Sequence, residues 1–295
     1  MNVAGEQEQM GGNLSRRGFL AGAATLLAAG EALPRIGGDL PTGAPDLSEP
    51  QENLDAVLRV TGSLREEDVP WWYDGTIFGI VGEQQPRPLI RFEGMELYWV
   101  RHLDNGEFEL IGNTVTFFRH VETGKMIDKF VNPYTGVTNT VKPAVQGGGP
   151  GRGFNYSVRG IRPTPFMDKM PEWPLVLDWS FARDMVWLHN ETQYPPGMPP
   201  PRAQRQTMFV PLDKFNDRAV QNLPTVFSST VFMPWLKWMD MGDRAGHVIW
   251  HASGAKLESI EQLPSEYRAR AESEYPQYMT ADPVAREKWM KPTYD

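Results

Sequence analysis

Residues 95–120 read MELYWVRHLDNGEFELIGNTVTFFRH, and this stretch decides the fold class. Two runs rich in aromatic and β-branched residues, 95–102 and 108–120, flank the triplet Asp104-Asn105-Gly106. Runs of this composition that are joined by an Asn-Gly turn are typical of a β-hairpin. The stretch therefore predicts two antiparallel strands.

Similar runs continue on both sides of this hairpin, with turn chemistry between them at Glu122–Lys125 and Asn132–Gly136. A series of neighbouring hairpins predicts a mostly β protein, an antiparallel meander that closes into a lipocalin-like barrel or forms two packed sheets. The sequence leaves these two arrangements open. The predicted strands are Thr76–Gly82, Pro88–Phe92, Met95–His102, Phe108–His120, Lys125–Val131, Thr138–Val141, Phe154–Ile161, Leu175–Arg183, Met185–Thr192, Gln206–Pro211, Thr225–Phe232 and Gly246–Ser253.

Helical patterns lie on either side of the strands. The apolar spacing over residues 53–60 predicts a short helix, with Asn53 as a possible N-cap. After Leu263 the pattern becomes helical again, and Asp282-Pro283 has the form of an N-cap followed by proline at the first helical position. We therefore expect C-terminal helices to accompany the sheet.

The N-terminus has the pattern of a twin-arginine export signal. Arg16-Arg17 precede Phe19-Leu20 and a short apolar run that reaches Ala29. This run is shorter than the roughly 20 apolar residues that a spanning helix needs. We therefore expect export by the twin-arginine translocase to the periplasm, with no membrane anchor in the mature form. The predicted organisation is a signal peptide over 1–32, a flexible linker over 33–52 and one β-rich domain over 53–295.

The composition argues against several classes of function. The chain has no cysteine, which removes disulfides, thiolate metal sites and cysteine nucleophiles. Its net charge of −8 disfavours a nucleic-acid partner, because binding to phosphates requires a basic face. We find neither a P-loop ending in Lys-Ser/Thr nor a dinucleotide fingerprint after a first strand. The sequence therefore predicts no cofactor, and it leaves open whether a metal is bound.

His247 and His251 form the closest histidine pair, and their spacing places both on one face of either a strand or a helix. Three roles remain open for them. The two histidines could bind a metal, which would need a third ligand from elsewhere in the chain. They could instead be acid–base groups, or structural residues held by hydrogen bonds. Val248 stands where the zincin motif has a glutamate, so that motif is absent.

Aromatic residues are abundant, with 10 Trp, 9 Tyr and 14 Phe. Strand alternation places them on the same faces as titratable groups, since Tyr98 shares a face with Glu96 and His102, and Phe117 shares one with Arg119. Two interpretations remain open, which are an ordinary mixture of core and surface, and a barrel lumen that binds flat rings.

Three segments carry a resemblance to a known family: Val69-Pro70-Trp71-Trp72-Tyr73, Val226–Met233 and Gly242–Gly254. With these, the chain over about residues 55–290 resembles a bacterial family catalogued as domain of unknown function 1838. The resemblance implies a mostly β fold and frequent twin-arginine signals. We associate it with bacteria that break down plant-derived aromatics, where cofactor-free lyases remove a one-carbon side-chain unit from phenylcoumaran-type dimers.

This association gives a functional hypothesis, a cofactor-independent carbon–carbon lyase that acts on a lignin-derived phenolic molecule and leaves a stilbene. Such chemistry needs a base, a proton donor, a cation for the phenolate and an aromatic slot. The alternative is a non-enzymatic periplasmic protein that binds an apolar aromatic ligand, and a metal-dependent hydrolase is a third class. The residues expected to act are His251 or His247 as the base, Tyr98 as the proton relay, Arg119 as the phenolate partner, and Trp99 and Trp250 as walls of the slot.

Overall fold

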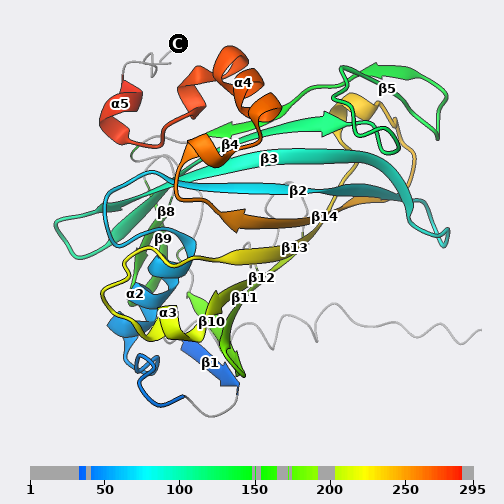
Figure 1. Ribbon diagram of the computed structural model, residues 1–295. Helices are drawn as coiled ribbons and strands as arrows, with labels where there is room; N and C mark the ends of the chain where they lie inside the picture. Colours follow the sequence, from blue (N-terminus) through cyan, green and yellow to red (C-terminus); the bar gives the residue numbers. More distant parts are fainter. Residues whose placement is uncertain are drawn as a thin grey trace, which may run out of the picture.

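The computed structural model describes residues 33–37, 41–147, 150, 154–164, 172, 175–191 and 203–287. The export signal expected over 1–32 lies outside these residues. The described chain forms one twelve-stranded sheet, a separate two-stranded sheet and several short helices (Figure 1).

The strands of the large sheet are paired in the order β1-β10-β11-β12-β13-β14-β2-β3-β4-β8-β9, and β7 also pairs with β4. The two-stranded sheet pairs β5 with β6. Every described pair is antiparallel except β1 with β10, which is parallel. The strands are β1 (Leu33–Gly37), β2 (Val69–Ile80), β3 (Arg87–His102), β4 (Phe108–Arg119), β5 (Lys129–Val131), β6 (Thr138–Thr140), β7 (Ala144–Gly147), β8 (Phe154–Ser157), β9 (Gly160–Pro163), β10 (Val176–Ala182), β11 (Met185–Glu191), β12 (Ala203–Pro211), β13 (Val226–Met233) and β14 (His247–Lys256).

The predicted fold class is confirmed: the protein is mostly β and antiparallel, with C-terminal helices. The sheet curls in a lipocalin-like manner, but closure into a barrel is not observed. Among the described residues, the path of paired strands runs from β1 at one edge to β9 at the other without returning. The barrel alternative is therefore wrong for this part of the chain, and the meander is a curled, open sheet (Figure 1).

Several predicted strand boundaries need correction. The first concerns Gly94, which continues the strand pairing instead of ending it. Gly94 pairs with Tyr73 on β2 and with Thr116 on β4, so the two runs predicted over 88–92 and 95–102 are the single strand β3. The strand predicted from Thr76 begins earlier, at Val69. The run predicted over 154–161 is instead a hairpin of β8 and β9.

The first helix, α2 (Pro50–Thr61), begins earlier than the apolar spacing predicts. Its N-cap residue is Glu49, so the prediction of Asn53 as the cap is wrong. Asn53 lies inside the helix and is buried, and its Oδ1 accepts a 2.8 Å hydrogen bond from Nε1 of Trp179. The predicted flexible linker also needs correction, because residues 33–37 form β1 and Leu47 is fully buried.

The sheet has two faces that carry separate cores. The inner face packs against α2 and α3 (Leu212–Asn216), which flank β10–β13 in Figure 1. Alternation along the strands and the contacts within this core place Trp71, Tyr73 and Phe92 on the inner face. The outer face carries the second core, which includes Met95 and Phe117.

The C-terminal helices α4 (Ser265–Glu274) and α5 (Pro283–Glu287) cover the outer face of β3 and β4 (Figure 1). Tyr267 on α4 is buried, and its hydroxyl donates a 2.6 Å hydrogen bond to the carbonyl oxygen of Val115. The predicted start of the last helix is confirmed, because the Asp282 carboxylate accepts a 2.9 Å hydrogen bond from the backbone N–H of Val284.

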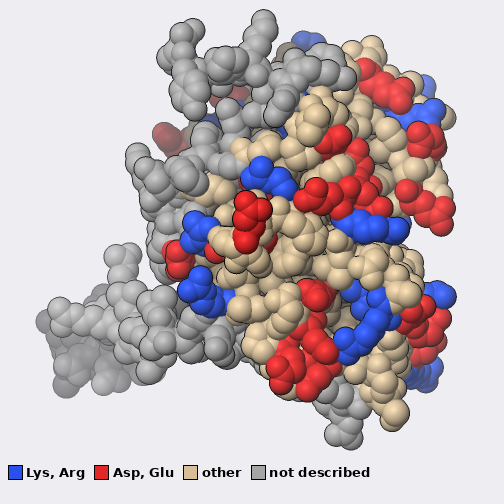
Figure 2. Space-filling model, turned by 90° about the vertical axis from the view of Figure 1, so that its left-hand side faces the viewer, with Lys and Arg blue, Asp and Glu red and all other residues tan. Residues whose placement is uncertain are grey.

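Acidic and basic side chains are interspersed over the face shown in Figure 2, and neither sign dominates it. Within the residues that the structure describes, no helix is both long enough and apolar enough to span a bilayer.

Candidate functional site

The six residues predicted from the sequence lie on two opposite faces of the sheet. His247 and His251 alternate with Val248 of the inner core, and Arg119 is in register with His251 across the sheet, so all three lie on the outer face. The outer face also holds Trp99, which packs against the second core. The inner face holds Tyr98 and Trp250, which pack against the first core.

The outer-face residues do not form one site. His251 is in register with Thr76, Arg91 and Arg119 on successive strands, which places about 14 Å between His251 and Arg119 at about 4.8 Å per strand. His251 is exposed, and its Nδ1 lies 3.2 Å from Oγ1 of Thr230. Arg119 as the phenolate partner and Tyr98 as the proton relay cannot act in one site, because alternation directs them to opposite faces.

Arg119 already has two carboxylate partners. Its guanidinium forms ion pairs with Glu93 on β3 and with Glu266 on α4, at 2.8 Å for the latter. A third hydrogen bond of 2.9 Å goes to the carbonyl oxygen of Gly124. Arg119 therefore links α4 to the sheet through its ion pairs. This geometry gives Arg119 a structural role in place of a phenolate-binding role.

We expect an Arg119→Met variant to lose about 3–5 kcal/mol of unfolding free energy, because it leaves the Glu93 carboxylate buried without its cation. The Glu93 side chain is only 8% exposed. A Glu266→Gln variant changes a carboxylate that is 65% exposed and is expected to cost less than about 1 kcal/mol. Urea unfolding of both variants measures the difference, and equal losses would contradict the assigned role.

The inner face holds a cluster of hydroxyl and carboxylate groups, which we call the Glu96 cluster: Glu96, Tyr98, Tyr73 and Thr116. The Tyr98 hydroxyl donates a 2.6 Å hydrogen bond to Oε2 of Glu96. The hydroxyls of Tyr73 and Thr116 lie 2.7 Å apart, and both residues are buried. One phenol therefore contacts a carboxylate and the other a threonine hydroxyl on the same face of the sheet, and the Tyr98–Glu96 pair is a suitable arrangement for moving a proton.

Two glycines make room for these phenol rings. A Cβ on Gly94 would lie 2.7 Å from Cε2 of Tyr73, and one on Gly112 would lie 3.0 Å from Cε1 of Tyr98. Each tyrosine thus lies across a neighbouring strand at a position that lacks a side chain. The absence of these two side chains lets the Tyr73 ring lie over β3 and the Tyr98 ring lie over β4.

A Gly94→Ala variant is expected to lose about 1–3 kcal/mol of unfolding free energy, because the new methyl group overlaps the Tyr73 ring. A double-mutant cycle with Tyr73→Ala tests this cause, since Gly94→Ala should cost little once the ring is gone. Urea unfolding of the four proteins gives the coupling. If the two costs simply add, Tyr73 is not the group that Gly94 accommodates.

Both phenols hold their protons at neutral pH. Burial, followed by the charge of Glu96, raises the pKa of Tyr98 well above that of an exposed tyrosine. Burial and the Glu96 charge also raise the pKa of Tyr73. Tyr98 is therefore a proton donor that is already hydrogen-bonded to a carboxylate acceptor.

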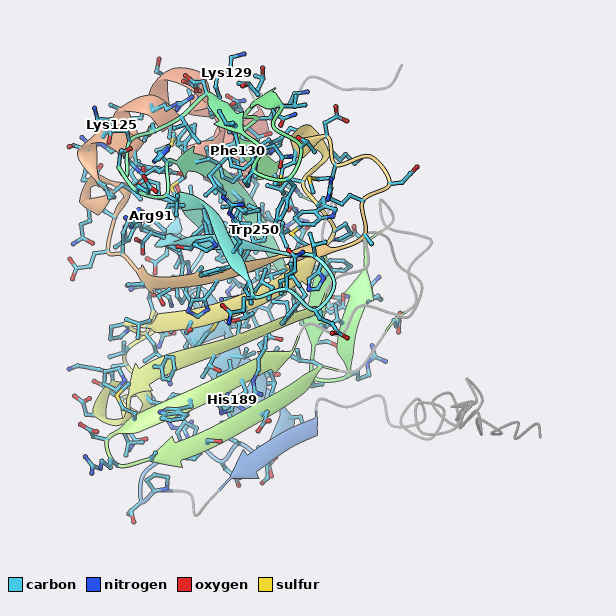
Figure 3. All side chains as sticks on the ribbon, turned by 90° about the vertical axis from the view of Figure 1, so that its right-hand side faces the viewer. Arg91, Lys125, Lys129, Phe130, His189 and Trp250 are labelled. Atoms are coloured by element: carbon cyan, nitrogen blue, oxygen red, sulfur yellow. The ribbon has the colours of Figure 1, made fainter. Side chains whose placement is uncertain are left out.

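Aromatic rings continue along the inner face from this cluster. The Tyr73 ring lies 6.2 Å from Phe92, which in turn lies 4.7 Å from Trp250. Phe118 lies 5.9 Å from Trp250 and 5.5 Å from Trp238. In Figure 3, Trp250 and Phe130 lie in the upper part of the molecule, while His189 is on β11 in the lower part. Trp250 therefore lies among tilted and edge-to-face rings of the inner core, and its role as a wall of an aromatic slot stays a prediction.

Lys256 is another buried titratable group on the inner face. Its Nζ donates hydrogen bonds to the carbonyl oxygens of Arg59 (3.0 Å) and Gly62 (2.9 Å) at the end of α2. Burial lowers the pKa of Lys256 well below its ordinary value. These two contacts give Lys256 the role of tying β14 to the helix, so we do not place it in the Glu96 cluster.

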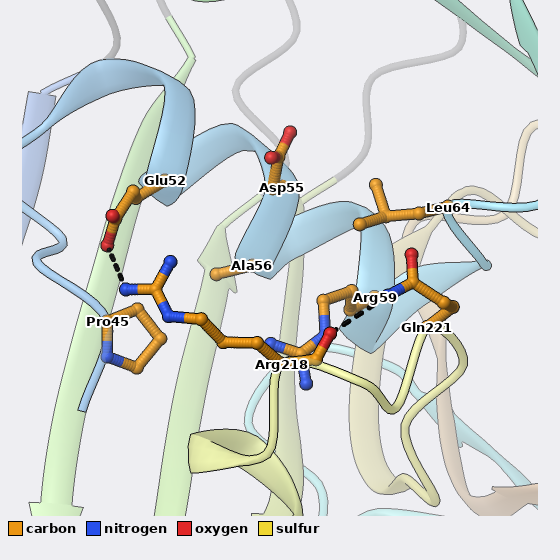
Figure 4. A pocket seen from close by; sticks show the side chains of 8 residues that line it. All are labelled: Pro45, Glu52, Asp55, Ala56, Arg59, Leu64, Arg218 and Gln221. Carbon is orange, nitrogen blue, oxygen red and sulfur yellow. Dashed lines mark hydrogen bonds and ion pairs between the residues drawn. The ribbon is translucent and has the colours of Figure 1, made fainter. Parts of the chain in front are cut away.

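A surface hollow of about 230 Å³ lies elsewhere, between α2 and the segment that follows α3 (Figure 4). The Glu52–Arg218 ion pair of 2.8 Å spans its rim. Arg59 on its wall donates to the carbonyl oxygens of Phe215, Val220 and two neighbouring residues. The charged groups of the hollow are therefore paired with protein atoms, and its lining contains none of the six predicted site residues.

Sequence reasoning placed Tyr98 in a candidate site but missed Glu96, Tyr73 and Thr116. Alternation along residues 96–102 does place Glu96 and Tyr98 on one face, so that signal was present. Tyr73 was missed because no strand was predicted before Thr76. Its proximity to Thr116 follows only from the register of β2, β3 and β4.

Together these observations define a class of protein: a curled antiparallel sheet whose inner face holds a phenol–carboxylate cluster among aromatic rings. The family model described as "Protein of unknown function (DUF1838)" matches residues 66–147 and 185–291, and the chain belongs to this family. A search of curated proteins finds no match. In the described part of the chain, no three His, Asp or Glu side chains are grouped so that they could hold a metal ion.

Proposed function

We propose that the protein is a cofactor-independent lyase that acts on a phenolic aromatic small molecule of the lignin-derived phenylcoumaran type, by acid–base chemistry in the periplasm. The observation that carries the proposal is the 2.6 Å hydrogen bond from Tyr98 to Glu96 on an inner face rich in aromatic rings. The proposal keeps Tyr98 as the proton relay. It assigns the base to Glu96 in place of His251 or His247, since both histidines lie on the outer face.

In the proposed reaction, Glu96 takes the proton of the substrate phenol. The resulting phenolate electrons break the benzylic carbon–oxygen bond of the neighbouring ring, and Tyr98 gives its proton to the departing ether oxygen. The side-chain hydroxymethyl group then returns a proton to the Tyr98 oxygen, and its carbon–carbon bond breaks to release formaldehyde. The electrons of that bond complete the stilbene double bond, and Glu96 returns its proton to the phenolate. Atoms and protons balance without an oxidant or a reductant.

The test is to incubate the purified mature protein with phenylcoumaran-type dimers that carry a free phenol. Stilbene absorbance and formaldehyde should rise together, in equal amounts. A dimer whose phenol is methylated should not react, because it has no proton for Glu96 to take. The absence of both products from the free phenol would overturn the proposal.

The second candidate function is a non-enzymatic binding protein for an apolar aromatic ligand. The chain of ring contacts from Tyr73 through Phe92 to Trp250 favours it, because such rings bind flat molecules whether or not chemistry follows. Tight binding of the dimers without stilbene or formaldehyde would support this candidate over the lyase.

A further inference from the structure

The outer face of strands β10–β14 has no helix packed against it in the described part of the chain. The helices α2 and α3 lie on the inner face, and α4 and α5 cover the outer face only at β3 and β4. Figure 3 looks onto this uncovered part of the sheet, with His189 on β11. We call the outer side of the adjoining strands β10–β14 and β2 the open face.

An apolar row on the open face continues the outer core beyond the helices that cover it. From Met95 and Trp72, which belong to that core, the strand register leads to Val226, Phe209 and Trp187. The rings of Trp187 and Phe209 lie 5.4 Å apart, and the Val226 side chain is 49% exposed. These last three residues belong to neither core. A contiguous exposed apolar row of this kind is typical of an interaction surface.

The middle of the open face carries no charged side chain. The outer positions of β13 are Val226, Ser228, Thr230 and Phe232, and Phe232 is 43% exposed. No outer position of β13 or β14 holds Asp, Glu, Lys or Arg, although 22% of the chain is charged. Depletion of charge at the centre of a surface, together with exposed aromatic rings, is the compositional mark of the core of a protein–protein interface.

The size and the pattern of the open face fit a second copy of this chain. Six strands at about 4.8 Å each and eight residues at about 3.3 Å each make a face of about 29 by 26 Å. This area is close to the roughly 800 Å² that each partner buries in a stable, specific interface. The pattern along β13 is apolar at both ends with hydroxyls between, so it reads the same in both directions. An inverted copy therefore places apolar residues on apolar ones, which is the self-match that a twofold interface requires.

We propose that the protein forms a homodimer in which two copies pack their open faces together about a twofold axis. Burial of the apolar ends of β13, with the Trp187 and Phe209 rings beside them, supplies the main stabilisation. The hydroxyls of Ser228 and Thr230 lie between these ends and bond across the interface or to trapped water. The interface does not involve the inner face, so the dimer is independent of the proposed lyase chemistry.

The test is sedimentation velocity of the purified protein over a range of micromolar concentrations. The wild-type protein is expected to sediment with twice the mass of one chain. Val226→Lys and Phe232→Lys each place a charge in the apolar part of the interface and should raise the dimer dissociation constant at least about tenfold. Val131→Lys is the matched control, because Val131 is a 65% exposed strand valine on the separate two-stranded sheet. It should remain dimeric.

A wild-type protein that stays monomeric over this range would overturn the inference. So would a dimer that survives both substitutions on β13, or one that Val131→Lys dissociates to the same extent. Small-angle X-ray scattering of the unmutated protein gives a second measurement that does not depend on any variant folding. A dimer that packs face to face is compact, whereas pairing through the edge strands β1 or β9 gives a longer particle and would contradict the inference.

Discussion

A Glu96→Gln variant is expected to lose about 10²- to 10⁴-fold in kcat/KM for the formation of stilbene from a phenolic dimer. Glutamine keeps the size of the side chain and can still accept the Tyr98 hydrogen bond, but it cannot take a proton. The loss should appear mainly in kcat, because the aromatic surface that binds the rings is unchanged. Initial rates measured by stilbene absorbance over a range of dimer concentrations separate the two parameters.

A tyrosine pair controls for structural damage in this experiment. Tyr98→Phe removes the proposed relay hydroxyl and should lower kcat, whereas Tyr267→Phe removes a buried hydroxyl that bonds to the carbonyl oxygen of Val115 on the outer face. Tyr267→Phe is therefore expected to keep wild-type kcat even if it unfolds at a lower temperature. A Glu96→Gln enzyme that retains more than roughly a tenth of the wild-type kcat would remove Glu96 from the role of base.

A Trp179→Ala variant is expected to lose about 3–5 kcal/mol of unfolding free energy, which is as large as the loss expected for Arg119→Met. Trp179 is fully buried on β10, and its ring lies 5.5 Å from that of Phe215 on α3. Its Nε1 also donates the 2.8 Å hydrogen bond to Asn53 on α2. The substitution therefore opens a cavity and leaves a buried amide oxygen without its donor. Urea unfolding followed by circular dichroism gives the free energy.

Two further variants separate these contributions. Trp179→Phe keeps most of the ring volume but loses the donor, so it should cost less than the alanine variant. Trp187→Ala, on the adjacent strand β11 but on the outer face, removes a ring that is only half-buried and should cost less again. If Trp187→Ala and Trp179→Ala are equally destabilising, α2 and α3 do not depend on the Trp179 contact.

Most of the fold follows from local patterns along the chain. The composition of residues 95–120 predicts the two strands of the β3–β4 hairpin. The Asp-Asn-Gly turn between them then fixes the strand pairing near the turn. Closure of the sheet was not predictable in this way. Whether the edge strands meet depends on the summed twist and register of all the strands. It also depends on β1, which pairs in parallel with β10 although the composition of its segment predicts a linker.

The candidate site was less predictable, for a related reason. Alternation correctly separated Tyr98 from Trp99 and Phe118 from Arg119, but it says which residues share a face of one strand and not which face is the inner one. Alternation therefore gave no reason to prefer Glu96 over the histidine pair as the base. Glu93 and Glu266 form ion pairs with Arg119, but both are distant from Arg119 in the sequence and from each other. No local pattern therefore reveals that the charge of Arg119 is already paired.

The central claim is that a phenolic ring binds on the inner face beside Glu96 and Tyr98. A crystal structure of the protein with 4-hydroxystilbene tests it most directly. The account predicts ligand density on the inner face, with the phenol oxygen within hydrogen-bond distance of the Glu96 carboxylate. Density on the outer face beside His247 and His251, with the inner face unchanged, would contradict it.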